Sequence, residues 1–218
     1  MKRVFPILLV LLMLVSAARA EVVGRSGDDY IHRWTAPNGQ ELYFVAVEEP
    51  FIRMQDVNFD GVEDVVVTTF FGASNVDVAF FVWDGGAYVA VEHPGMDRLI
   101  NYELYPEAGV VATGSSEGMA GAWHTKQLWR WQGTSLELVR SAESYPVETV
   151  RFEDDVLTVI TDNSRVRLRV WDVLDQATEN GVTAPALLMD VEFPLDDEEA
   201  FLRADEAEQR ALWQGLLP

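Results

Sequence analysis

The segment from Asp56 to Asp64 has the residue types and spacing of a metal-binding loop. Oxygen-bearing side chains stand at its first, third, fifth and ninth positions, which are Asp56, Asn58, Asp60 and Asp64. Calcium prefers six to eight oxygen ligands, and a short loop surrounds it only where alternate side chains converge. Gly61 at the sixth position permits the sharp turn, and the main-chain carbonyl of Val62 can add a ligand. The spacing therefore predicts a Ca²⁺ site formed by these four side chains and the Val62 carbonyl.

The residues after this loop argue against an EF-hand. An EF-hand needs a bidentate glutamate at position twelve, and Val67 occupies that position here. The next residues, Val65 to Phe71, are β-branched and aromatic, which predicts a strand rather than a helix. An ordinary acidic turn is the alternative interpretation of the segment.

A loop of this form between strands resembles the FG-GAP and related repeats of bacterial β-propellers. A longer resemblance, from Phe51 to Val139, includes Phe81-Val82-Trp83-Asp84, Tyr88-Val89 and Gln127 to Trp131. It is similar to a family of small exported bacterial proteins that includes periplasmic immunity proteins, which inhibit lysozyme-like effectors. The resemblance implies a propeller-like fold, bound calcium and an inhibitory role. The chain departs from the lipoprotein members of that family because it has no cysteine.

A second segment of interest runs from Thr113 to His124 and is rich in small residues. Such residues let a backbone enter a narrow cleft, and we expect a loop here that contacts a protein partner. The residues that would make the contact are Ser115, Ser116, Glu117 and Gly118. Some periplasmic lysozyme inhibitors insert a loop of similar composition into the enzyme. An ordinary connection between two strands is the alternative.

Patterns typical of enzymes are not found in the sequence. His32, His93 and His124 are far apart and have no zinc-ligand spacing, and no Gly-x-Ser-x-Gly or phosphate-binding glycine motif occurs. We therefore expect the protein not to be an enzyme. Acidic pairs are so numerous that a secreted hydrolase with two carboxylates is not excluded.

The N-terminus has the three parts of a secretory signal peptide. A basic start at Lys2 and Arg3 precedes an apolar run from Val4 to Val15 and a small-x-small end, Ala18-Arg19-Ala20. Residues 1–20 are therefore predicted to be removed by cleavage after Ala20, and the mature protein is expected in the periplasm or outside the cell. An uncleaved anchor is the alternative.

Charge limits the classes of partner. The 218 residues include 36 acidic and 16 basic side chains, a net charge of −20. Such a field repels nucleic acid and anionic lipid and attracts divalent cations and basic proteins. Cleavage after Ala20 leaves 13 basic and 36 acidic residues and a net charge of −23. A protein partner is therefore expected and nucleic acid is not. No membrane span is expected, because no later stretch is long and apolar enough to be a transmembrane helix.

The pattern of strands and turns predicts an all-β domain over residues 21–195. The expected architecture is a small β-propeller-like or antiparallel β-barrel domain. An aromatic residue precedes a polar turn and a strand at Trp34, Trp83, Trp131 and Phe152, which is either a decayed blade repeat or ordinary sheet punctuation. Residues 172–184 are expected to form a loop or one to two helical turns.

Residues 196–218 are expected to form an acidic C-terminal helix. Asp196 and Glu199 make a capping-box pattern, and Gly215 is a natural stop. An apolar stripe is expected from Phe201, Ala204, Leu212 and Trp213.

Taken together, the sequence predicts an exported calcium-binding β-domain that inhibits a lysozyme-like peptidoglycan hydrolase. The alternatives are a calcium-stabilised structural or adhesive envelope module and a secreted hydrolase.

Overall fold

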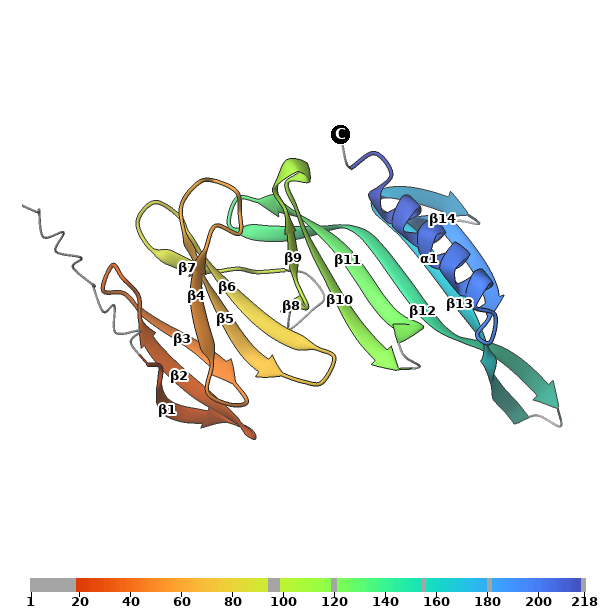
Figure 1. Cartoon of the computed structure of the whole chain (residues 1–218), viewed down its shortest axis with the longest axis horizontal. Coiled ribbons are helices and arrows are strands. Elements are labelled where there is room, and N and C mark those ends of the chain that lie inside the picture. The colour runs from red at the N-terminus through yellow and green to blue at the C-terminus, as the bar shows by residue number, and fades with distance from the viewer. Residues whose placement is uncertain (1–18, 94–98, 119–120, 154–155, 180–181, 217–218) are drawn as a thin grey trace, which may run out of the picture.

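The computed structural model describes residues 19–93, 99–118, 121–153, 156–179 and 182–216 (Figure 1). The first sheet contains β1 (Glu21–Ser26), β2 (Asp29–Thr35) and β3 (Glu41–Ala46) in that order. The second contains β4 (Phe51–Gln55), β5 (Asp64–Phe71), β6 (Val76–Trp83) and β7 (Tyr88–Ala90), with β8 (Leu99–Ile100) also paired to β6. The predicted signal peptide lies almost wholly outside the described residues.

The third sheet is the largest and has the order β14-β13-β12-β11-β10-β9. Its strands are β9 (Glu103–Tyr105), β10 (Val110–Gly118), β11 (Trp123–Gln132), β12 (Ser135–Glu153), β13 (Val156–Glu179) and β14 (Val182–Pro194). A short 3₁₀ turn, Pro106–Ala108, joins β9 to β10. The all-β expectation is confirmed, and every strand pairing named above is antiparallel. Within the described residues none of the three sheets closes into a barrel.

The second sheet lies between the other two because its strands are apolar on both faces. Val65, Val67 and Phe81 pack against Leu42 and Phe44 of the first sheet. On the opposite face, a cluster with Val66, Phe80 and Val82 includes residues of β10 and β11. Figure 1 shows the three sheets following one another along the long axis of the molecule. Strand β3, by contrast, buries every second side chain, as expected where one face is exposed.

The C-terminal helix α1 (Glu198–Trp213) covers one face of the third sheet at β12, β13 and β14. Its predicted apolar stripe is confirmed, since Ala204 and Leu212 are buried and the ring of Phe201 packs on Phe193. The helix cap is Asp197 rather than Asp196, because the Asp197 side chain accepts the Ala200 N–H. Gly215 follows the helix with a φ of +73°, in the conformation that favours glycine at a helix end.

Two segments expected to be loops are strands. Residues 113–118 belong to β10, and residues 123 and 124 begin β11; residues 119–120 lie outside the described part. Residues 172–179 continue β13, and β14 starts at Val182. The polar composition of both segments suggested loops, but long antiparallel neighbours satisfy their backbone groups. A register irregularity between Asp172 and Gln176 accommodates the polar stretch of β13.

Strands β12 and β13 extend beyond the rest of their sheet as a two-stranded hairpin. His124, at the start of β11, pairs with Ser144, and the register of β12 shifts at Pro146. Beyond that shift, residues 147–153 pair only with residues 156–162, and we call these residues the arm. Figure 1 shows the arm projecting from the end of the third sheet where β10 ends and β11 begins.

Candidate functional site

The predicted calcium loop connects β4 to β5 and is bent around the carboxylate of Asp56. Asp56 Oδ1 accepts the backbone N–H groups of Phe59 at 2.7 Å and Asp60 at 3.2 Å, and its Oδ2 accepts that of Gly61 at 3.0 Å. Phe59 and Gly61 have φ values of +66° and +86°, which allow this tight path. The loop is therefore closed by its first predicted ligand.

Asn58 and Asp60 lie next to each other on the exposed side of this loop. Asn58 Nδ2 donates to Asp60 Oδ2 at 2.9 Å, and Asn58 Oδ1 accepts the Asp60 N–H at 3.1 Å. Asp60 Oδ1 accepts the Val62 N–H at 2.8 Å. The structure thus brings together Asn58 and Asp60, the third and fifth positions of the predicted site. The hydrogen bond from the Val62 N–H to Asp60 holds the backbone of Val62 next to them.

Asp64 faces the sheet and is fully buried. Its Oδ2 accepts the Val57 N–H at 3.0 Å, and its Oδ1 accepts the Trp83 N–H at 2.8 Å, so it joins the loop to the end of β6. Burial raises the pKa of Asp64, and these backbone hydrogen bonds oppose that rise. The negative charge of nearby Asp60 raises it further. Asp64 therefore has a structural role whether or not it also binds a metal.

The residues of the loop suit calcium in chemistry, since all five predicted ligands offer oxygen. In the described residues, however, no three or more His, Asp or Glu side chains are grouped as a metal site. Their carboxylates are instead turned toward backbone N–H groups. Each carboxylate oxygen has a second lone pair, so Asp56, Asn58 and Asp60 are the side chains that would hold the ion. Bound calcium would there neutralise the adjacent carboxylates.

The loop also packs against the third sheet and is hydrogen-bonded to it. Val57 is fully buried in the cluster between the second and third sheets, and its carbonyl accepts the Trp131 Nε1–H at 2.8 Å. The loop is therefore in direct contact with β11.

The predicted partner-binding residues lie at the end of the β10–β11 hairpin. Ser115 pairs with Thr125 and Ser116 with His124, and the Ser115 and Thr125 hydroxyl oxygens are 2.7 Å apart. Gly118 follows a register shift opposite Trp123. Glu117 is exposed, and its carboxylate accepts the Ser115 hydroxyl at 3.1 Å.

The turn between β5 and β6 holds this hairpin in position. Asn75 Oδ1 accepts the Ser116 N–H at 2.9 Å, and Asn75 Nδ2 donates to the Ser116 carbonyl at 3.1 Å. Asn101 Nδ2 donates to the carbonyl of Gly114 at 3.0 Å. A Cβ at Gly114 would lie 2.9 Å from the Thr125 carbonyl oxygen, so the small residue is needed for the close approach of β11.

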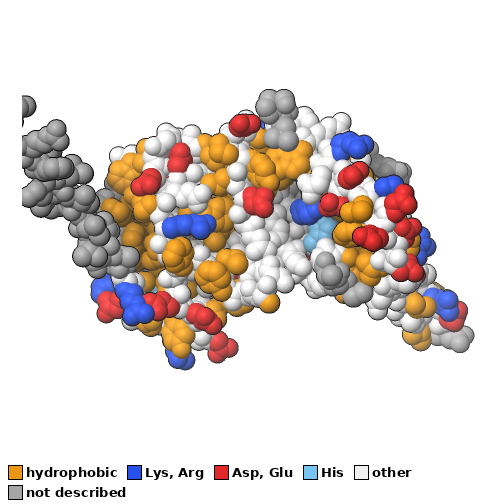
Figure 2. All heavy atoms as spheres, in the orientation of Figure 1, with side chains coloured by type: hydrophobic (Ala, Val, Ile, Leu, Met, Phe, Trp, Pro, Cys, Tyr) orange, Lys and Arg blue, Asp and Glu red, His pale blue; other side chains and the backbone are white. Residues whose placement is uncertain are grey.

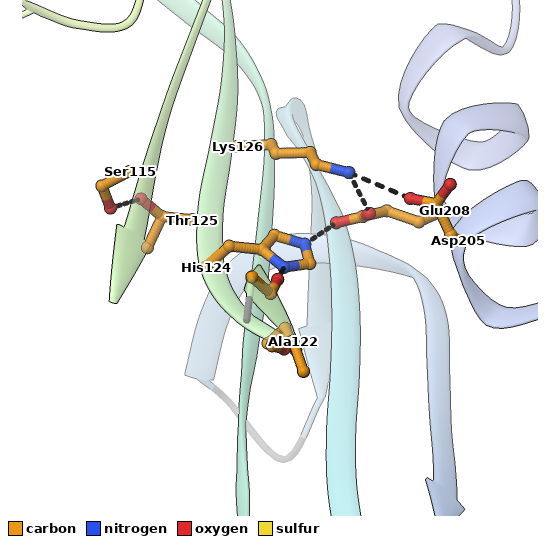
Figure 3. Close-up of polar contacts among 9 residues, drawn as sticks. Ser115, Ala122, His124, Thr125, Lys126, Asp205 and Glu208 are labelled. Carbon is orange, nitrogen blue, oxygen red and sulfur yellow. Dashed lines mark hydrogen bonds and ion pairs between the residues drawn. The ribbon is translucent and has the colours of Figure 1, made fainter. Parts of the chain in front are cut away.

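A buried charged group beside this hairpin was not predicted. Figure 3 shows Glu208 of α1 facing His124 and Lys126 of β11, with Oε1 2.7 Å from His124 Nε2 and Oε2 2.6 Å from Lys126 Nζ. Glu208 is completely buried, whereas Asp205, which lies 3.3 Å from Lys126, is half-exposed. His124 Nδ1 also contacts the Gly121 carbonyl at 2.8 Å. With both ring nitrogens engaged, His124 has a structural role.

The sequence contains a signal that could have predicted the burial of Glu208. Glu208 stands midway between Ala204 and Leu212 at a spacing of four residues, on the stripe expected to be apolar. A charged residue on a buried helix face requires a partner of opposite charge. The sequence does not say which cation that is, because Lys126 and twelve arginines follow Ala20.

An open cleft of about 320 Å³ lies between the hairpin and α1. Ser115, Ser116, Thr125 and Lys126 line one side, and Trp213 and Leu212 line the other. Tyr105 and Glu103 of β9 close one end, where the Tyr105 hydroxyl donates to Glu103 Oε2 at 2.6 Å. This hydrogen bond raises the pKa of Tyr105 to about 12. Figure 2 shows charged side chains of both signs over the helix and more hydrophobic ones over the first and second sheets.

No helix in the described part of the chain has the length and apolarity needed to cross a membrane.

Comparison with known proteins found no matching family model and no matching curated protein. A solved structure described as the crystal structure of CarG is similar at 17% identity, covering 72% of this chain and 92% of CarG. Its TM-score is 0.26, so this similarity carries no argument about fold or function.

Proposed function

We propose that this chain is an exported, calcium-stabilised β-domain that binds and inhibits a lysozyme-like peptidoglycan hydrolase and has no catalytic activity of its own. The observation that carries the proposal is the fixed β10–β11 hairpin, which presents exposed Glu117 next to the Ser116 backbone held by Asn75. A segment already ordered in the free protein loses less conformational entropy on binding than a loop that must fold onto its partner.

Charge supports a cationic partner. The chain carries a net charge of −20, or −23 after the predicted cleavage. Lysozyme-like enzymes are commonly basic because their substrate is anionic. Opposite charge raises the association rate, whereas the fit of the hairpin to the enzyme cleft would supply specificity.

Calcium would act on this surface indirectly. The loop that contains Asp56 and Asp60 leads into β5, and β5 ends just before the turn in which Asn75 holds Ser116. The same loop is bonded to β11 through Val57 and Trp131. An ion at the loop would thus stabilise two supports of the hairpin without touching the partner.

Export and a propeller-like architecture belong to the same proposal. Strand β1 begins at Glu21, so cleavage after Ala20 would remove no residue of the first sheet. Each sheet is built chiefly from strands that are neighbours in sequence, and the second sheet packs between the other two, as successive blades do. We propose that the sheets are blade-like units of a periplasmic or secreted protein.

A peptidoglycan-clearing assay tests the proposal, with cationic lysozymes and low-salt buffer containing calcium. Glu117→Ala and Ser116→Ala should weaken inhibition while leaving the melting temperature unchanged. Glu107→Ala is the matched control, since it removes the same charge from an exposed position at the opposite end of β10. If no lysozyme is inhibited at micromolar protein, the inhibitor function is wrong; if Glu107→Ala acts like Glu117→Ala, the hairpin is not the inhibitory surface.

The arm favours a second candidate function, a structural or adhesive module of the envelope. On one face of the arm, Val150 pairs with Val159 and Phe152 with Leu157. Phe152 is 67% and Leu157 63% exposed. Exposed apolar clusters of this kind are typical of protein-binding surfaces. Replacing both residues by serine should abolish envelope association if this is the function, and should leave lysozyme inhibition unchanged if the hairpin carries it.

A further inference from the structure

The cleft between the β10–β11 hairpin and α1 has an aromatic wall at one end. The rings of Tyr105 and Trp213 lie there with centroids 4.5 Å apart and planes inclined by 55°. Both residues are half-buried, and both line the cleft. An aromatic face at the edge of a cleft offers a flat apolar surface to a ligand, in addition to its packing role.

Polar groups with remaining hydrogen-bonding capacity surround this wall. Glu103 accepts the Tyr105 hydroxyl with Oε2, so its Oε1 can accept a further donor. Lys126 Nζ has three N–H groups, and Glu208 and Asp205 take two of them. Ser115 of β10 and Thr125 of β11 add two hydroxyl groups, whose oxygens are 2.7 Å apart. The cleft therefore offers both donors and acceptors at short range.

The formal charges in and around the cleft are mostly negative. Lys126 is matched by buried Glu208, while Asp205 adds a half-exposed carboxylate and Glu103 an exposed one at the cleft end. Because Lys126 is already held by two carboxylates, it is a poor site for an anion. The remaining carboxylate of Glu103 is suited to accept hydroxyl groups.

We propose that this cleft binds a neutral pyranose sugar, with one face of the ring on Trp213 and its hydroxyl groups near Glu103, Lys126 and Thr125. A pyranose ring combines an apolar C–H face with a rim of hydroxyls, which matches an aromatic wall bordered by donors and acceptors. The cleft volume of about 320 Å³ accommodates one ring and leaves the rest of a chain in solvent. The cleft shares Ser115 and Ser116 with the proposed inhibitory surface, but sugar binding would rest on Trp213, Glu103, Lys126 and Thr125 and does not depend on inhibition.

The test is titration of the full protein with two neutral trisaccharides, maltotriose and the β-1,4-linked trimer of N-acetylglucosamine, and with trigalacturonic acid as an anionic comparator. Calorimetry and tryptophan fluorescence report binding. We expect a neutral trimer to bind with a dissociation constant of roughly 10⁻³ M and the anionic trimer to bind more weakly. Failure of both neutral trimers to bind, or tighter binding of the anionic one, would overturn the proposal.

Variants locate the binding site. Trp213→Ala should weaken neutral-trimer binding roughly tenfold through loss of the aromatic face. Trp83→Ala is the matched control, because Trp83 forms a comparable pair with Tyr88 at 5.2 Å in the second sheet. Glu103→Gln keeps the shape of an exposed side chain, so it remains informative if Trp213→Ala is unstable, and it should weaken binding severalfold. Unchanged affinity in Glu103→Gln together with unchanged affinity in Trp213→Ala, or an equal loss in Trp83→Ala, contradicts the assignment.

Discussion

Asp60 and Asp64 belong to the same loop, yet their carboxylates face opposite surroundings. Asp60 lies on the exposed side beside Asn58, whereas buried Asp64 accepts the N–H groups of Val57 and Trp83. Asp60→Ala should therefore abolish the rise of melting temperature with calcium and change the protein little in chelator. Asp64→Ala should cost about 2 kcal/mol in both conditions, because two backbone donors lose their acceptor.

Scanning calorimetry of both variants in calcium and in chelator separates these two roles. Stabilisation by a ligand that binds only the folded state grows with the logarithm of its concentration. Magnesium serves as the control cation, since it demands a more regular octahedral geometry than this loop offers. Identical melting curves of the unmodified protein in calcium and in chelator would remove calcium from the proposed function.

His32 provides a prediction about pH. It is buried in the first sheet, it stacks on Phe44 at 5.9 Å, and neither ring nitrogen has a hydrogen-bond partner among the described residues. Burial lowers its pKa, so below about pH 6.5 the unfolded chain takes up a proton that the folded chain resists. The stability should be complete above the ordinary pKa of histidine and should decrease as the pH falls below it.

His32→Phe should remove this contribution, because phenylalanine can stack on Phe44 without a group to protonate. The melting temperature of the variant should exceed that of the unmodified protein, and the difference should grow between pH 8 and pH 5. Melting curves at several pH values measure it. A difference that stays constant over this range would mean that His32 does not resist protonation in the folded state.

At the scale of elements, Glu208 joins α1 to β11. Removing a fully buried carboxylate leaves Lys126 without its counter-charge and His124 Nε2 without its hydrogen-bond partner, whereas Asp205 is half-exposed. Glu208→Ala should therefore lower the free energy of unfolding by about 3 kcal/mol, and Asp205→Ala by less than about 1 kcal/mol. Urea denaturation of the two variants gives the comparison. Equal effects would show that the burial of Glu208 adds nothing to its contribution.

Short hairpins and the helix were predictable because their signals are local. Asn38-Gly39 is a turn signal directly before the β-forming residues of β3, and Gly39 has a φ of +85°. The apolar stripe of α1 predicted its buried face. The 113–118 and 172–179 segments were not predicted as strands because their residues are polar or small, and pairing with distant neighbours decides their conformation.

In the candidate site, too, local features were predictable from the sequence and long-range contacts were not. The spacing of Asp56, Asn58 and Asp60 predicted a calcium loop, which stays a prediction; the structure shows a tight loop at these residues that is closed by their own side chains. The contacts of Ser116 with Asn75 and of His124 with Glu208 join residues 41 and 84 positions apart. No local pattern encodes such distances, so the sequence placed Ser116 in a region of interest without identifying what surrounds it.

At the scale of the whole molecule, the three sheets are held by apolar clusters between neighbouring sheets. Val57, Trp129 and Leu136 belong to the cluster between the second and third sheets, and Leu42 and Phe44 to that between the first and second. The alternation of each strand predicts which faces are apolar. It does not predict how many sheets follow one another or whether they close, because sheet packing depends on contacts between separate hairpins.

The net charge of −20 sets the response of the whole molecule to salt. Repulsion among exposed acids favours expansion, and about 0.1 M salt screens it beyond roughly 10 Å. Shielded ion pairs such as Arg140–Asp172 and Lys126–Glu208 are screened much less. The melting temperature measured in chelator should therefore rise as sodium chloride increases from about 0.01 M to 0.3 M.

Inhibition of a cationic lysozyme should weaken over the same range, because its attraction to the acidic surface is screened. Parallel melting and inhibition titrations test the opposite signs, and a melting temperature that falls with salt would mean that attractive ion pairs outweigh the repulsion.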